Sequence, residues 1–362
     1  MRSLLAALAL FTVVAGVRPE PPRLLVASSS GPSGGAFGVL DAAPPFPLAA
    51  GFRAAEPGSV LRAHGKYAYL LSRTTGVLAV HELGKAKQKK RWELGAASEP
   101  QDLVVLGPRL AYVSRQRATH LLRIDPKNGR RREVVDFSHL ADADGNPDLG
   151  NLLVRDGRLY VQIRRRDDNG SFAPPAMIAV VDLATETLVD ADPATDGVQA
   201  IVLAGTSPKM AMQVIGEPPK LFVSASGAFM DAGGLERIDL DTLTSEGLVI
   251  AEEDGVVGAD LGAFVMTSAS EGFLVFSTDL LLSSHLLPFS IPGGVAPGPE
   301  WIVSLDYFAP TLAYDPETGL LYYPHNGASD TGVHVFDAAT GERLTETAAP
   351  APGPPTDLLF LP

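Results

Sequence analysis

The chain contains no cysteine among its 362 residues. This absence excludes disulfide bonds, thiolate metal sites, iron–sulfur clusters and cysteine nucleophiles. Positive charge is also scarce, because 29 lysines and arginines stand against 42 aspartates and glutamates, for a net charge of -13. Nucleic acid and anionic membrane surfaces both attract proteins with a positive field, so neither is expected as a partner.

Catalytic motifs of fixed spacing are scarce as well. The only G-x-S-x-G match is Gly31–Gly35, which reads as a glycine-proline turn, and no glycine-rich loop has P-loop or dinucleotide-binding spacing. Nucleophilic hydrolysis and nucleotide chemistry are therefore not expected. The seven histidines include no pair at a metal-ligand spacing such as H-x-x-x-H.

Long hydrophobic runs are absent, and the apolar segment Leu4–Val14 is too short to span a membrane. With Arg2 before it and small residues after it, this segment predicts an export signal over residues 1–16, followed by a proline-rich leader over 17–22. The alternative is an uncleaved strand or helix of the core. Val17 stands where a lipidated cysteine would be needed, so we expect an exported periplasmic or extracellular protein without a lipid anchor.

The 36 glycines and 30 prolines are spread along the chain, which favours many short strands joined by tight turns. A repeated unit places an acidic residue at the end of an apolar strand, followed by a turn. These register marks are Asp41, Glu82, Asp125, Asp182, Asp239, Asp279 and Asp337. Their spacings of 41, 43, 57, 57, 40 and 58 residues are near those of four-stranded propeller blades with loop insertions.

One internal match predicts how the ring closes. The segment PQDLVVL at residues 100–106 opens the third repeat, and PTDLLFL at residues 355–361 ends the chain with the same pattern. The first repeat lacks such an opening strand. We therefore predict an all-β, seven-bladed β-propeller over residues 23–362, with the first blade completed by the C-terminal strand.

The repeats VVDLATETLVD at 180–190 and VFDAATGERL at 335–344 resemble those of bacterial YVTN-type (YncE-like) exported β-propellers. The segment RIDPKNGR fits the same signature with asparagine in place of threonine. The resemblance implies a propeller of the cell envelope. It implies no shared reaction, because propellers of one fold serve many functions.

Insertions mark one face of the predicted ring. Five long connections are expected to join a second strand to a third strand, or a fourth strand to the next blade, and both kinds of connection lie on the same face. They are residues 137–149, 164–175, 191–208, 225–234 and 290–310. A binding site is expected on that face. The candidate ligand-binding residues are His325, Asn326, Arg164, Asp148 and Asn151. The alternative is that long loops accumulated there without selection.

A possible calcium loop lies in the first insertion, where D-A-D-G-N-P-D supplies alternating oxygen donors from Asp142, Asp144, Asn146 and Asp148. The segment departs from an EF-hand, which requires glycine at its sixth position and glutamate at its twelfth. Pro147 and Leu153 stand there instead. Solvated turn residues are the alternative.

These observations favour a monomeric cell-envelope binding or scaffold module that contacts an unknown envelope protein or a small ligand. A propeller enzyme such as a calcium-dependent lactonase or other hydrolase is the alternative, and a surface-display protein without a ligand is a third. An enzyme would need carboxylates and an amide that converge at the channel mouth. The candidates by position are Asp102, Asp148, Asn151, Asp260 and Asp306.

Overall fold

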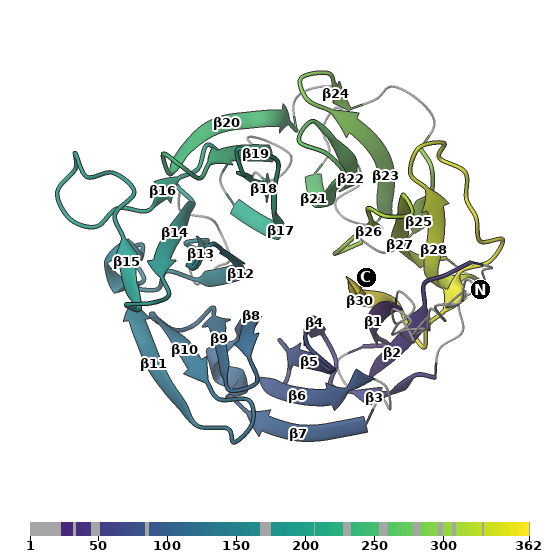
Figure 1. Ribbon diagram of the computed structural model, residues 1–362, viewed down its shortest axis with the longest axis horizontal. Coiled ribbons are helices and arrows are strands. Elements are labelled where there is room, and N and C mark those ends of the chain that lie inside the picture. The colour runs from purple at the N-terminus through teal and green to yellow at the C-terminus, as the bar shows by residue number, and fades with distance from the viewer. Residues whose placement is uncertain are drawn as a thin grey trace, which may run out of the picture.

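The computed structural model describes residues 23–31, 34–44, 51–83, 87–166, 175–205, 207–226, 233–252, 260–277, 283–295, 300–305, 309–327 and 329–361. These residues form seven antiparallel sheets arranged in a ring (Figure 1). The prediction of an all-β, seven-bladed propeller is confirmed. The predicted export signal and leader, residues 1–22, lie outside the described residues.

The strands of each blade are given from the channel outward. The first blade comprises β30 (Pro355–Leu361), β1 (Arg23–Ser29), β2 (Gly35–Asp41) and β3 (Arg53–Ala55). The second comprises β4 (Ser59–His64), β5 (Tyr67–Ser72), β6 (Val77–Glu82) and β7 (Lys87–Glu93). The third comprises β8 (Pro100–Gly107), β9 (Leu110–Arg115), β10 (His120–Ile124) and β11 (Arg131–Asp136). The fourth comprises β12 (Leu149–Arg155), β13 (Arg158–Ile163), β14 (Met177–Asp182) and β15 (Thr187–Val189), and β16 (Ile201–Val202) also pairs with β14.

The fifth blade comprises β17 (Ser207–Ile215), β18 (Lys220–Ser226), β19 (Gly234–Asp239) and β20 (Thr244–Ala251). The sixth comprises β21 (Asp260–Met266), β22 (Glu271–Ser277) and β23 (Ser283–Ser290), with two short outer strands, β24 (Gly294–Val295) and β25 (Val303–Leu305). The seventh comprises β26 (Ala313–Asp315), β27 (Leu320–Asn326), β28 (Thr331–Asp337) and β29 (Ala349–Pro350). Two 3-10 turns, η2 (Ala96–Ser98) and η3 (Ser138–Leu140), precede the third and fourth blades.

The two ends of the described chain close the ring. Strand β30 pairs antiparallel with β1, from Arg23 opposite Leu361 to Ala27 opposite Asp357. It also lies next to the channel, beside the first strand of the second blade (Figure 1). The predicted completion of the first blade by the C-terminal strand is therefore confirmed.

Turn chemistry explains why the acidic marks recur. The carboxylate of Asp337 accepts the backbone N–H groups of Ala339 and Thr340, both at 2.9 Å, and Asp182 holds its own turn in the same way. An aspartate after the third strand thus fixes the hairpin to the fourth strand. In the second blade Glu82 ends the third strand, and its carboxylate pairs with Lys66 and Lys89 instead.

Blade six departs from the prediction. The mark Asp279 lies outside the described residues and follows β22, which is the second strand of this blade, whereas Ser290 ends the third strand. The predicted insertion 290–310 is also divided. Residues 291–293 join β23 to β24 on the opposite face, and β25 pairs with the start of β23, so that Leu305 lies opposite Ser283 near the inserted-loop face.

The apolar core is divided among the seams between blades. Each of the seven clusters of buried apolar side chains in the described residues joins two neighbouring blades. The closing strand contributes to two seams, because Leu358 packs with blade seven and Leu359 lies against the seam with blade two. Within the described residues, no helix has the length and apolar character needed to cross a membrane.

Candidate functional site

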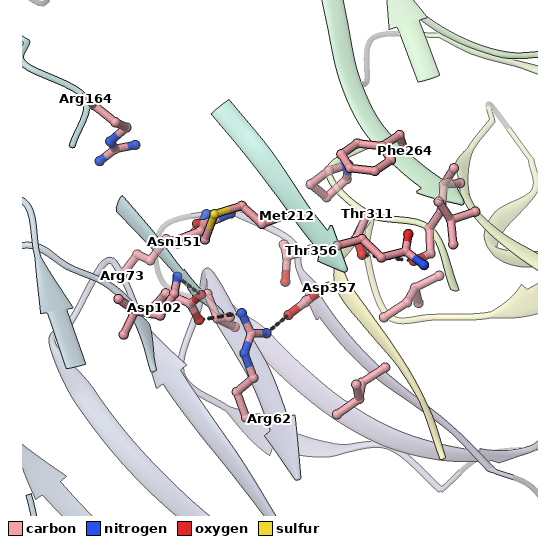
Figure 2. Close-up of a pocket in the computed structure, with 18 residues that line it drawn as sticks. Arg62, Arg73, Asp102, Asn151, Arg164, Met212, Phe264, Thr311, Thr356 and Asp357 are labelled. Atoms are coloured by element: carbon pink, nitrogen blue, oxygen red, sulfur yellow. Dashed lines mark hydrogen bonds and ion pairs between the residues drawn. The ribbon is translucent and has the colours of Figure 1, made fainter. Parts of the chain in front are cut away.

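A cavity of about 570 Å³ occupies the channel, where the innermost strands of the blades meet (Figure 2). Its volume falls within the range of roughly 300–1,000 Å³ that is usual for small-molecule sites. Its polar side is formed by three arginines and two aspartates, and its other side is largely apolar. Two of its lining residues, Arg73 and Arg164, directly follow second strands, and these strands end at the face where the sequence predicted a ligand site.

Arg62, on β4, is paired with carboxylates from both neighbouring inner strands. Its Nη2 donates to Oδ1 of Asp102 at 2.5 Å, and its Nη1 lies 3.6 Å from Oδ2 of Asp357 (Figure 2). Burial acts to lower the pKa of Arg62, but the charges of the two aspartates outweigh burial and hold the pKa above its ordinary value. The positive charge of this arginine is therefore compensated within the protein.

The same two aspartates connect blades through the backbone. Asp357 accepts the N–H of Leu61 at 2.7 Å, and Asp102 accepts the N–H of Leu152 at 2.9 Å. In each case the acceptor belongs to one inner strand and the donor to the inner strand of the next blade. The repeated P-x-D-L pattern that predicted ring closure thus has a structural role at the channel.

Arg73 and Arg164 bring two further guanidinium groups to the cavity, and both follow second strands. Arg73 donates from Nε to the carbonyl of Gln101 at 2.8 Å, and Arg164 donates from Nη2 to Oε1 of Gln116 at 2.8 Å. No ion pair joins either arginine to a carboxylate in the described part of the chain, and Nε of Arg164 is buried without a hydrogen-bond partner there.

The pKa values of both arginines lie below the ordinary value. Burial within the channel lowers the pKa of Arg73, although part of its side chain is exposed and the charges of Asp102 and Asp357 act to raise the pKa. Burial, together with the nearby charges of Arg73 and Arg166, lowers the pKa of Arg164 to about 10. Both groups are charged at neutral pH, and their mutual repulsion is an unfavourable feature that a bound anion would relieve.

Of the ligand-binding residues that the sequence indicated, Arg164 and Asn151 line the cavity. Asp148 does not line the cavity; it is buried and accepts the backbone N–H of Arg166 at 2.6 Å. Burial raises the pKa of Asp148 to about 6. Sequence reasoning did not select Arg62 and Arg73. The signal for Arg62 was a charged residue within the inward strand Ser59–His64.

The carboxylates proposed for an enzyme at the channel mouth do not gather there among the described residues. Asp102 lines the cavity, but its oxygens are engaged by Arg62 and by backbone N–H groups. Asp148 and Asp260 are not among the lining residues, and Asp306 lies outside the described residues.

The predicted calcium loop forms a series of tight turns. Asp142 accepts the N–H of Asp144 at 3.2 Å, and Asp144 accepts the N–H of Asn146 at 2.7 Å. The carboxylates of Asp142, Asp144 and Asp148 do not form a close three-ligand group in the described structure. Calcium binding by this loop stays a prediction, for which a calcium titration followed by thermal melting is the test.

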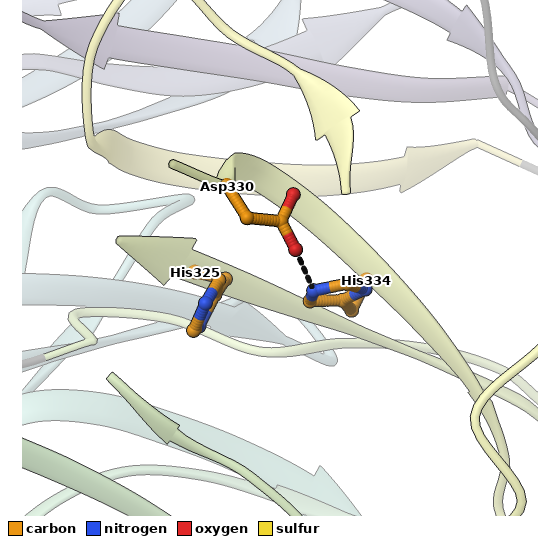
Figure 3. A group of neighbouring side chains, drawn as sticks. All are labelled: His325, Asp330 and His334. Atoms are coloured by element: carbon orange, nitrogen blue, oxygen red, sulfur yellow. Dashed lines mark hydrogen bonds and ion pairs between the residues drawn. The ribbon is translucent and has the colours of Figure 1, made fainter. Parts of the chain in front are cut away.

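The seventh blade brings together a group that the sequence analysis missed. His325, at the end of β27, lies beside His334 on β28, with ring centroids 5.1 Å apart, and Asp330 lies above them (Figure 3). No two histidines stand at a spacing such as H-x-x-x-H, but this pair comes together across a hairpin at a spacing of nine residues. Asn326, the neighbouring candidate, accepts a hydrogen bond from Thr331 at 3.1 Å.

Comparisons with known proteins agree with the fold. No family model and no curated protein matches the chain. Similar solved structures include a Bacteroides fragilis protein named provisionally as a 6-phosphogluconolactonase, with a TM-score of 0.61 and 13% identity over 94% of this chain and 98% of that one. Apo AztD from Citrobacter koseri has a TM-score of 0.51 and 13% identity over 94% and 98%. Dihydro-heme d1 dehydrogenase NirN has a TM-score of 0.56 and 14% identity over 94% and 75%.

Likeness at such identities shows a shared β-propeller fold and no shared activity. The narrower resemblance to YVTN-type repeat proteins stays a prediction. The chain is an all-β protein whose described residues form a seven-bladed propeller with a polar, arginine-lined cavity in its channel.

Proposed function

We propose that this chain is an exported cell-envelope binding protein whose channel takes a small organic anion. The observation that carries the proposal is the pair Arg73 and Arg164, which reach the cavity from the inserted-loop face without a carboxylate partner in the described structure. The short apolar segment at the N-terminus, preceded by Arg2, supports export.

Charge complementarity supports an anionic ligand. Two guanidinium groups held near each other without a counter-ion repel, and a carboxylate or phosphate supplies strong, charge-assisted hydrogen bonds to both. The whole chain has a net charge of -13. Long-range attraction therefore does not draw anions to this protein, and selection depends on direct contacts within the cavity.

The apolar wall of the cavity indicates the chemistry of the rest of the ligand. Met212 and Phe264 line this part of the cavity, together with the hydroxyl-bearing Thr311 (Figure 2). An apolar surface beside paired cations suits a molecule with an anionic group on a hydrocarbon or aromatic body. The enzyme alternative needs a free carboxylate or a bound cation in the channel, and no contact described for this cavity favours either.

Isothermal titration calorimetry with benzoate and phenyl phosphate tests this proposal, and benzamide serves as the uncharged counterpart of benzoate. We expect at least one anion to bind with a Kd below about 1 mM, while benzamide binds more weakly. Arg73→Gln and Arg164→Gln should each weaken the anion by about 10-fold or more, since a hydrogen bond to a charged group contributes roughly 1.5–3 kcal/mol.

Arg155→Gln is the matched control, because Arg155 ends β12 on the opposite face and pairs with Asp156. It should leave the affinity unchanged. Failure of both anions to bind, equal binding of benzamide, or equal affinities in all three variants would contradict the proposal. Cell fractionation with an antibody against the mature chain tests export separately.

A further inference from the structure

A second site, independent of the channel, is formed by the hairpin between β27 and β28. In the strand register His325 lies opposite Gly332, and Tyr323 lies opposite His334. His325 and His334 are therefore diagonal neighbours on one face of the sheet. Asp330, in the loop that joins the strands, extends its carboxylate toward His334 (Figure 3).

The three side chains offer ligand atoms at one place. One ring nitrogen from each histidine and one carboxylate oxygen lie within 4.8 Å of one another. Nε2 of His334 is already 3.0 Å from Oδ2 of Asp330. Two ligands of a tetrahedral zinc ion, bound at about 2.1 Å, lie about 3.4 Å apart, so small side-chain movements bring all three atoms to metal-binding positions.

Hydroxyl groups orient both imidazole rings. Nδ1 of His334 lies 2.9 Å from Oγ1 of Thr345, and Nδ1 of His325 lies 2.7 Å from Oγ of Ser304. A hydroxyl group can donate or accept, so once a metal ion displaces the proton that Nε2 of His334 shares with Asp330, each ring can hold its proton on Nδ1 and offer Nε2 as a lone pair. Metal-binding histidines are commonly held in this way through the ring nitrogen that does not bind the metal.

Space is preserved beside His325 by a glycine. A Cβ atom on Gly327 would lie 2.8 Å from Nε2 of His325, and the N–H of Gly327 donates to the carbonyl of Asp330 at 3.0 Å. The loop therefore passes close to the open ring nitrogen while its own ends are tied together. His334 is fully buried, whereas the Asp330 side chain is 30% exposed, which gives an ion access from solvent.

The charges near the group include one of each sign. Asp330 is the acidic neighbour of both rings, and Arg343 is the basic one. The Asp330 carboxylate offsets the repulsion between Arg343 and a cation.

We propose that His325, Asp330 and His334 bind one divalent transition-metal ion of the zinc class. Two imidazoles and a carboxylate suit such an ion better than calcium or magnesium, which prefer oxygen ligands alone. With three protein ligands, a fourth position is left for water or for a donor atom of another molecule.

The test is zinc binding by the untagged mature chain after treatment with EDTA and desalting. Titration at pH 7.5 in competition with a chromophoric chelator should give one zinc ion per chain with a Kd of 1 μM or tighter. Substitution of cobalt should give the visible absorption of a four-coordinate ion. Calcium at millimolar concentration should not displace the zinc.

His325→Gln and Asp330→Asn should each weaken zinc binding at least 10-fold. Asp330→Asn retains an oxygen for the N–H of Ala348, which Asp330 accepts at 2.7 Å, so this variant should fold normally. His120→Gln is the control, because His120 also has an aspartate neighbour, Asp136, but lies in the third blade. This variant should bind zinc as tightly as the wild-type protein does.

A wild-type Kd weaker than 100 μM would overturn the proposal. So would unchanged affinity in both ligand variants, or an equal loss in His120→Gln. Benzoate binding by the channel should be the same with and without zinc. Failure of one site is therefore distinguishable from failure of the other.

Discussion

Leu358 offers a direct test of how the ring is held closed. Its side chain is 5% exposed and packs in the seam between the first and seventh blades, with Leu24, Val26 and Tyr322. Replacing a buried leucine by alanine removes apolar contacts and leaves a cavity, which costs roughly 2–5 kcal/mol. We expect about 3 kcal/mol for Leu358→Ala, because the terminal strand can relax partly into the space.

This loss can be converted into a melting temperature. An unfolding entropy of about 2.1 cal/mol/K per residue gives about 0.8 kcal/mol/K for 362 residues, so 3 kcal/mol corresponds to about 4 °C. Thermal melting followed by circular dichroism measures the shift. Leu344→Ala is the matched control, since Leu344 is 37% exposed and its truncation should change stability by less than about 0.5 kcal/mol.

A chain that ends at Pro354 extends the same test. It lacks all of β30 and therefore loses the strand pairing with β1 and the hydrogen bond that the N–H of Leu61 donates to Asp357. Its melting temperature should be well below that of Leu358→Ala. Equal melting of Leu358→Ala and Leu344→Ala would refute the seam argument. A truncated chain as stable as the full one would refute closure by the terminal strand.

Two further predictions concern the backbone and the channel. Gly332→Ala should lower the free energy of unfolding by about 2 kcal/mol or more, because φ is +155° and the new Cβ would lie 1.8 Å from the carbonyl oxygen of Ala349. Gly107→Ala, which meets nothing within 4 Å, should be nearly neutral, and similar losses in urea unfolding would contradict the steric argument. Asp102→Asn should destabilise by about 2 kcal/mol, because partly exposed Arg62 keeps only Asp357 at 3.6 Å as a charged partner. Asp156→Asn, at an exposed carboxylate, is its control, and equal melting of the two variants would contradict a structural role for the Arg62 pair.

The fold was predictable because its signals are local. Asp182 and Asp337 each hold the turn that follows them, so the pattern of an apolar strand and an aspartate recurs wherever a third strand ends. Blade six shows the limit of this reasoning. Its third strand ends at Ser290 and is followed by a proline turn. The sequence pattern instead places the acidic mark at Asp279, which follows the second strand.

The candidate sites were less predictable because their residues meet only after folding. Arg73 and Arg164 are separated by ninety residues in sequence and come together only through the ring. His325 and His334 show the same limit at shorter range, because a nine-residue spacing has no meaning until the strand register is known. A hairpin of β27 and β28 whose loop ends just before Thr331 places both histidines on one face of the sheet.

The pairing of Arg23 with Leu361 also determines where additional polypeptide can be attached. Strand β1 begins, and β30 ends, on the face opposite the one where Arg73 and Arg164 enter the channel. A fusion partner, affinity tag or surface linker joined at either position would therefore extend away from the channel mouth. Immobilising the protein through either of these residues should orient the disc with its cavity facing the solution.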